Sequence, residues 1–127
     1  MPVICIKTLP LNRPLKINEI LRKLNLKVSE DTGIEANRIW SYWQFIERHL
    51  YAVGDTTAVS IQSQSHSPIV EITGIEGKST KIIEALMRST AGVISQVLEI
   101  DITNIFITYN EVRYGRVFDG GEVVKLK

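Results

Sequence analysis

Two β-branched runs and two amphipathic segments dominate the pattern of apolar positions along the chain. Residues 3–8 and 68–73 are short runs rich in valine and isoleucine, which is typical of β-strands. Between residues 78 and 98 the apolar side chains recur every three or four positions, which predicts a helix with one apolar face. These apolar positions are Ile82, Ile83, Leu86, Met87, Val93, Ile94, Val97 and Leu98. Ser79 or Thr80 could cap the start of this helix.

An earlier segment has the same helical character. Its predicted core face consists of Leu15, Ile20, Leu21, Leu24 and Val28. Pro14 suits the first turn of such a helix, because a missing N–H costs nothing there. The helix is predicted to end at Gly33, since glycine tolerates the left-handed conformation that commonly closes helices.

Two further strands are predicted at about residues 38–46 and 103–109, the second of them rich in β-branched and aromatic side chains. The tail, residues 110–127, contains Gly115, Gly120 and Gly121 as turn signals between short apolar pairs. We therefore expect a short hairpin or a terminal edge strand in the tail.

The chain resembles itself at an offset of 66 residues. At this offset residues 1–6 lie over 67–72, and residues 34–40 lie over 100–106. Two separated matches at one offset indicate an internal repeat. With 127 residues, the prediction is a single domain of two repeats, about 1–66 and 67–127. The predicted fold class is α+β: two βαβ repeats forming a four-stranded mixed sheet with both helices on one face.

Side-chain alternation sends apolar residues of the predicted strands to both faces of the sheet, and two helices can cover only one. This favours self-association through the other face. A net charge of +1 gives no electrostatic footprint for nucleic acid, and no apolar run is long enough to span a membrane. The single cysteine, Cys5, cannot form an internal disulfide, so a reducing compartment, the cytoplasm, is expected.

Pro2 is the sharpest candidate for chemistry. If the preceding methionine is removed, Pro2 carries a secondary amine at the chain terminus. An α-amino group has a pKa of about 7.7–8.0, and burial against an apolar wall lowers it. Such an amine could act as a base near neutral pH. The alternative is that Pro2 is merely the first residue of a strand.

Other residue types give weaker signals. His49 and His66 have no ligand-like neighbours in the sequence, so no metal site is expected. Cys5 lies between two isoleucines and is predicted to be a small buried apolar residue. No motif for a cofactor is present, and none is expected.

Met1-Pro2 opening directly into a strand, the two βαβ halves and the glycine-containing tail together resemble the tautomerase superfamily. That group includes 4-oxalocrotonate tautomerase (4-OT), macrophage migration inhibitory factor and malonate semialdehyde decarboxylase. The segment from Thr103 to Glu122, ending Gly-Arg-Val-Phe-Asp-Gly-Gly-Glu, is similar to the last strand, glycine turn and Gly-Gly-Glu tail of 4-OT without a gap. The sequence is most similar in character to a bacterial tautomerase-like subgroup.

The resemblance implies a homotrimer with pockets between subunits and no cofactor. Pro2 would be the base that moves a proton between carbon and oxygen of a small carboxylated keto or enol compound. Arg13, in the loop after the first strand, matches the loop arginine of the family. Arg113 and Arg116 lie in the matched tail and would bind the substrate carboxylate. Arg38 is offset by one from the family position and is expected to face the other side of the sheet.

Two aromatic residues complete the site that the resemblance implies. Phe106 stands where 4-OT has an arginine and where macrophage migration inhibitory factor has a tyrosine. Phe118, or its neighbour Val117, would form the aromatic wall of the pocket. Because the strand arginine is missing, a non-catalytic protein of the same fold is an alternative. A ferredoxin-like ligand-binding or structural protein is another, since its elements follow the same order.

Overall fold

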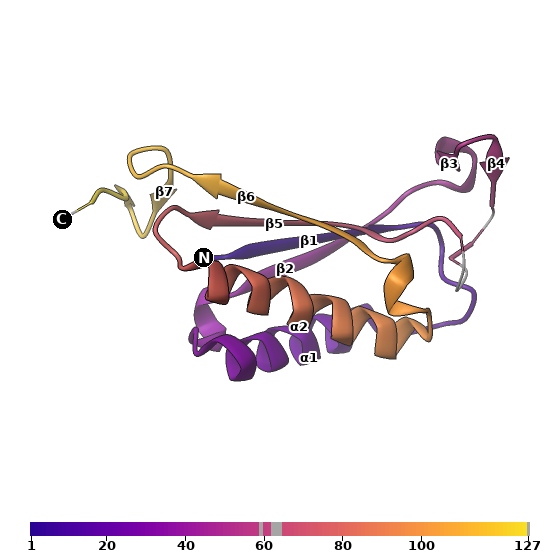
Figure 1. The fold of residues 1–127 in the computed structure, drawn as a ribbon, viewed down its shortest axis with the longest axis horizontal. Coiled ribbons are helices and arrows are strands. Elements are labelled where there is room, and N and C mark those ends of the chain that lie inside the picture. Colours follow the sequence, from indigo (N-terminus) through magenta and orange to yellow (C-terminus); the bar gives the residue numbers. More distant parts are fainter. Residues whose placement is uncertain (59, 62–64, 127) are drawn as a thin grey trace.

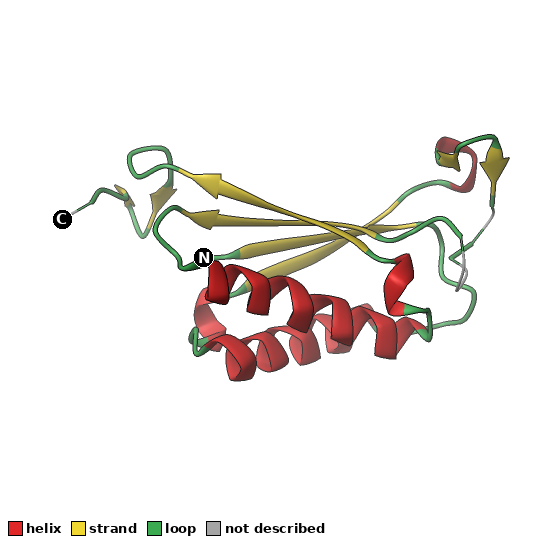
Figure 2. Cartoon of the chain, in the orientation of Figure 1, coloured by secondary structure: helices red, strands yellow, loops and turns green. Residues whose placement is uncertain are grey.

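A computed structural model describes residues 1–58, 60–61 and 65–126 of the chain. The principal sheet has four strands in the order β2-β1-β5-β6, and both long helices lie on the same face of it (Figure 1). Figure 2 shows the resulting two-layer arrangement, with the helices on one side and the strands on the other. The predicted α+β class and mixed four-stranded sheet are confirmed.

The first half of the chain supplies two neighbouring strands and one helix. β1 (Val3–Thr8) leads through a loop into α1 (Ile17–Thr32). A single 3-10 turn (Ala36–Arg38) then precedes β2 (Trp40–Phe45). β1 and β2 pair in parallel, with Val3 opposite Trp40.

The second half repeats this order. β5 (Ile69–Ile75) is followed by α2 (Thr80–Leu98), a 3-10 turn (Ile102–Asn104) and β6 (Phe106–Val112). β5 and β6 also pair in parallel. Each of the four strands in the sheet starts 66 residues from its counterpart in the other half.

The two halves join through antiparallel pairing of β1 with β5, in which Val3 lies opposite Thr73. Within each half the two strands are direct neighbours. A ferredoxin-like fold is built from a split βαβ unit, in which another strand separates the two. The ferredoxin-like alternative is therefore wrong as a description of this sheet.

Short hairpins lie outside the main sheet. β3 (Ala52–Val53) pairs with β4 (Thr56–Thr57) after a 3-10 turn (Arg48–Leu50). In the tail, β7 (Phe118–Asp119) pairs with β8 (Glu122–Val123). The two glycines between β7 and β8 have φ angles of 64° and 84°, in the left-handed region that glycine adopts most readily. The predicted tail hairpin is confirmed.

Two of the predicted helix ends are as expected, and one is wrong. Gly33 adopts the left-handed conformation and its N–H donates to the Ser29 carbonyl oxygen at 2.9 Å. The Ser79 hydroxyl accepts a hydrogen bond from the Ile82 N–H and caps α2. Pro14, in contrast, precedes the first helix rather than entering it. The first backbone hydrogen bonds of α1 end at the Lys16 carbonyl oxygen, so the helix begins only at Ile17.

The predicted strands at 38–46 and 103–109 start later than expected, because a 3-10 turn occupies the residues before each. In the second case the Asp101 carboxylate accepts a hydrogen bond from the Thr103 N–H at 3.0 Å and fixes that turn. The strand then runs on as far as Val112.

The core lies between the sheet and the helices. Its fully buried members are Ile4, Ile6, Leu24, Val28, Val70, Ile72, Leu86 and Ile94. The alternate residues of the strands point the other way, onto a face that no helix covers. We call this surface the open sheet face; it includes Val3, Cys5, Lys7, Trp40, Tyr42, Glu71 and Phe106. Among the described residues, no helix is long and apolar enough to cross a membrane.

Candidate active site

Pro2 lies buried at the start of β1, where the sheet fixes its backbone. The Trp40 N–H donates to the Pro2 carbonyl oxygen at 3.0 Å, and the following residue, Val3, is paired on its other side with β5. Met1 precedes Pro2 and is half-buried, so the Pro2 nitrogen is part of a peptide bond in this structure. The candidate base is thus at a strand end that the fold holds firmly.

The amino terminus at this end of the sheet has an altered basicity. Burial lowers the pKa of the Met1 α-amine below its usual value, and this is the largest cause. The Asp119 carboxylate opposes the change, while the positive charges of Lys78 and Arg38 add to it. This end of the sheet therefore disfavours an α-ammonium cation.

Lys78 is a half-buried cation that the fold brings to this end, and the sequence does not single it out as a site residue. Because β5 runs antiparallel to β1, the loop between β5 and α2 lies beside the start of β1. The Lys78 side chain is half-buried, and burial lowers its pKa, with Glu111 acting in the opposite direction. In the sequence Lys78 is marked only by its position directly after Gly77. That position indicates a place near Pro2 only once the pairing of β1 with β5 is known.

Tyr109 of β6 reaches over Gly74 of β5 at the same end. A Cβ added at Gly74 would clash with Tyr109 Oη and would lie 3.4 Å from Lys78 Nζ. The phenolic oxygen is buried and has no hydrogen-bond partner. Burial raises the pKa of Tyr109, and the nearby Glu111 raises it further. Tyr109 is therefore a protonated hydrogen-bond donor at neutral pH.

Arg13 and Phe106 lie at the opposite end of the sheet from Pro2. Arg13 Nη2 donates to the Val97 carbonyl oxygen at 2.8 Å and pairs with Glu99 at 3.2 Å, near the end of α2. Phe106 begins β6, beside Pro68, and half of its surface is exposed. The fold does not bring either residue together with Pro2 of the same chain.

The tail residues lie at the same end as the amino terminus (Figure 1). Arg113 and Arg116 are exposed, and Arg116 Nη1 donates to the carbonyl oxygen of Gly115, in its own turn. Phe118 is 72% exposed, so its ring covers nothing within this chain. Of the predicted substrate-binding residues, the three in the tail are those that share an end of the molecule with Pro2.

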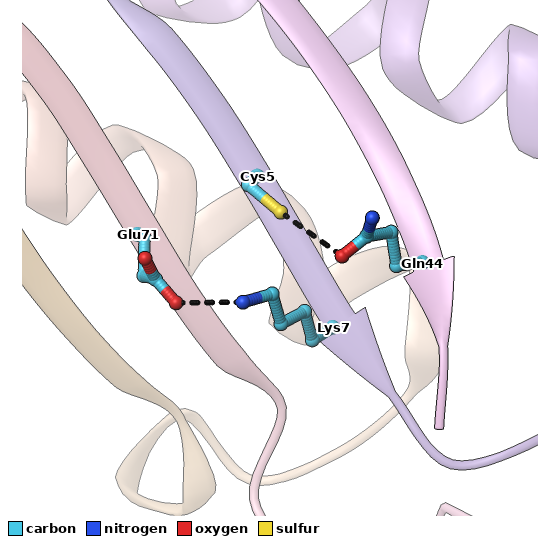
Figure 3. Close-up of polar contacts among 4 residues, drawn as sticks. All are labelled: Cys5, Lys7, Gln44 and Glu71. Atoms are coloured by element: carbon cyan, nitrogen blue, oxygen red, sulfur yellow. Dashed lines mark hydrogen bonds and ion pairs between the residues drawn. The ribbon is translucent and has the colours of Figure 1, made fainter. Parts of the chain in front are cut away.

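The open sheet face carries a polar cluster of its own (Figure 3). Lys7 Nζ of β1 and Glu71 Oε1 of β5 form an ion pair at 2.8 Å, and Cys5 Sγ lies 4.0 Å from Gln44 Oε1 of β2. Cys5 is buried, as predicted. These groups lie in the middle of the face, away from the strand end that holds Pro2.

No protein-family model matches the sequence, and no curated protein matches it. Solved structures do match. Pt0534 inactivated by 2-oxo-3-pentynoate superposes with a TM-score of 0.80 at 10% identity, over 96% of this chain and 94% of that one. A fused 4-OT in an asymmetric trimer gives 0.80 at 16% identity, over 95% and 94%. N1, of the cis-3-chloroacrylic acid dehalogenase family, gives 0.76 at 10%, over 96% and 82%.

These likenesses span nearly the whole chain and establish its architecture. The protein is of the class built from two βαβ units around one mixed sheet, and its fold is that of the tautomerase superfamily. The resemblance seen in the sequence is therefore confirmed at the level of the fold.

Proposed function

We propose that this protein, after removal of Met1, is a cofactor-independent tautomerase of small carboxylated keto or enol compounds. Pro2 is its general base. The observation that carries the proposal is the environment of the amino terminus. Pro2 is buried at a strand end where burial lowers the pKa of an α-amine, against the opposing effect of Asp119. Lys78 and Arg38 lower it further. The same surroundings would lower the pKa of a free prolyl amine there and so favour its neutral form, which can accept a proton.

The proposed reaction moves one proton and no other atom. The lone pair of the Pro2 nitrogen takes a proton from the carbon next to the carbonyl of a 2-oxo acid. The electrons of that C–H bond form the carbon–carbon double bond of an enolate, and negative charge develops on oxygen. The prolyl ammonium then returns the proton to the oxygen, which gives the enol and restores the amine. Lys78 favours the developing negative charge.

The substrate carboxylate needs a cation of its own. Arg113 and Arg116 are the candidates from this chain, because both are exposed at the Pro2 end. Phe118 would cover the substrate from the same hairpin. Arg13 and Phe106 lie at the other end and could take part only in a pocket shared with a neighbouring subunit. A substrate of this class fits the 2-oxo acid that inactivates Pt0534.

The test compares Pro2→Ala with Pro68→Ala, the matched proline at the other end of the sheet. Deuterium exchange at C3 of pyruvate, followed by NMR, measures proton abstraction directly. We expect Pro2→Ala to slow exchange by about 10²-fold, because it replaces a secondary amine held in a ring by a freely rotating primary amine, and Pro68→Ala to have little effect. Equal rates in the wild type and Pro2→Ala would refute Pro2 as the base, and exchange by the wild type no faster than in buffer would favour the non-catalytic alternative.

We also propose that the chain is a single domain of two repeats and that it forms a homotrimer in the cytoplasm through the open sheet face. Large apolar side chains, Trp40, Tyr42 and Phe106, are about half exposed on this face. Exposed apolar surface of this extent typically marks an interface. A fused 4-OT with the same fold is a trimer, which supports the choice of assembly.

The assembly can be tested with two matched substitutions. Tyr42 on the open sheet face and Leu26 on α1 are 46% and 47% exposed. Tyr42→Asp places a charge in the proposed interface, whereas Leu26→Asp places one on the helical side. By light scattering we expect the wild type and Leu26→Asp to have three times the chain mass of 14.3 kDa, and Tyr42→Asp to be a monomer. A monomeric wild type would refute the trimer.

A further inference from the structure

The Tyr109 hydroxyl is an exception to the usual pairing of buried polar groups. Its oxygen is buried without a hydrogen-bond partner. It lies beside Gly74, where the side chain of any other residue would be. Most buried hydroxyls in folded proteins have a partner, so an unpaired one calls for a specific explanation.

The equivalent position in the other half of the chain has a partner. Trp43 and Thr8 stand 66 residues before Tyr109 and Gly74, and Trp43 Nε1 donates to Thr8 Oγ1 at 3.0 Å. Thr8 is fully buried, and its hydroxyl gives the Trp43 ring N–H an acceptor. Where the first half has a threonine, the second has Gly74, which offers no side-chain acceptor and leaves room for the phenol.

Pro2 is the residue that lies across from Gly74. Val3 is opposite Thr73, so the next step along the antiparallel pair brings Pro2 beside Gly74. Alternation places the Pro2 ring on the same side as Ile4, the side facing the helices, where Tyr109 also packs. The Pro2 nitrogen in a peptide bond has no available lone pair, whereas a free prolyl amine has one.

We propose that the free amine of Pro2 is the missing partner of the Tyr109 hydroxyl. Tyr109 donates its O–H to the neutral nitrogen and holds the lone pair in place; it is a positioning residue rather than the base. This inference rests on the proposed function, because both need Met1 to be removed. Gly74 is part of the arrangement, since any side chain there would displace the phenol.

A donor to the neutral amine stabilises the neutral form and so lowers the pKa of Pro2. The charged groups around the amine are Lys78 before α2 and Arg38 before β2, which act in the same direction, and Asp119 of β7, which opposes them. Glu111 of β6 faces Lys78 and Tyr109. The Tyr109 hydroxyl therefore lowers the pKa of the Pro2 amine in addition to the effect of Lys78 and Arg38.

The experiment measures the pKa of the Pro2 amine by NMR titration of protein labelled with ¹⁵N-proline, on chains whose mass confirms loss of Met1. Tyr109→Phe keeps the ring and removes only the hydroxyl. We expect it to raise the pKa by roughly 1 unit, the equivalent of one ordinary hydrogen bond. Gly74→Ala, which displaces the hydroxyl, should raise it similarly, and should add nothing in the Tyr109→Phe background.

The matched control is Tyr51→Phe. Tyr51 is also half-buried, but its hydroxyl donates to the Ser67 carbonyl oxygen at the other end of the sheet, at 2.8 Å, so its loss should leave the pKa of Pro2 unchanged. An unchanged pKa in Tyr109→Phe would overturn this inference and leave the tautomerase proposal standing. A raised pKa in a protein that exchanges no substrate protons would support the inference and refute the proposed reaction.

Discussion

The two ends of the sheet share one backbone frame and differ in chemistry. At each end a proline precedes a strand, and its carbonyl oxygen accepts from the first N–H of the neighbouring strand, at 3.0 Å for Pro2 and 3.1 Å for Pro68. Three side-chain positions then differ between the ends. Gly74, Lys78 and Tyr109 surround Pro2, whereas their counterparts 66 residues earlier are Thr8, Asn12 and Trp43.

The difference shows how a repeated scaffold can carry a site at only one end. At the Pro68 end the Trp43 ring N–H donates to the Thr8 hydroxyl. The counterpart of Lys78 there is the uncharged Asn12. Pro68 also lies in mid-chain, so its nitrogen can never be a free amine. At the Pro2 end an unpaired hydroxyl and a half-buried lysine remain. The fold alone does not define a function, and the proposed function depends on these few side chains.

Removing the charge of Lys78 should reduce activity more than any other change described below, if the two ends of the sheet differ as proposed. Lys78→Met should lower kcat/KM for the exchange of a 2-oxo acid by about 10²-fold, because a positive charge aimed at a developing enolate is lost. Steady-state kinetics on Lys78→Met and on a control variant would test this. Lys81→Met is the control, since Lys81 is exposed on the outer side of α2. A similar loss of kcat/KM in both variants would mean that Lys78 does not specifically stabilise the enolate.

A smaller effect separates the two ends by stability. In the chain that keeps Met1, Thr8→Val removes the fully buried acceptor of the Trp43 ring N–H and should cost about 1–3 kcal/mol. Tyr109→Phe removes a hydroxyl that already lacks a partner, so its cost should be within about 0.5 kcal/mol of zero. Urea denaturation of the two variants measures both. A large cost for Tyr109→Phe would show that its hydroxyl has a partner in that form of the protein.

Local signals made much of the fold predictable. Gly33 and Ser79 mark helix ends because backbone conformation and capping are decided by a few neighbouring residues. The start of α1 was not predictable in the same way. Pro14 is compatible with a first helical turn, but the chain is held there by contacts such as the bond from Arg13 to Val97, 84 residues away.

The candidate site shows the same limit. Pro2 stands out from its position in the sequence, whereas the cation near it cannot be identified without the strand pairing. Because β1 and β5 are antiparallel, the loop after β5, which holds Lys78, lies beside the start of β1. The loop after β1, which holds Arg13, lies at the other end. The sequence predicts Tyr109 only as part of a strand, since nothing local indicates that its hydroxyl lies over Gly74 without a partner.

The proposed function requires Pro2 to carry a free amine at the end of the sheet that holds Lys78 and Tyr109. The most direct measurement is the intact mass of the protein purified from its native host. We expect a mass lower by one methionine residue than that of the full sequence. Complete retention of Met1 would leave the Pro2 nitrogen in an amide, with no lone pair to accept a proton, and would contradict the proposed function.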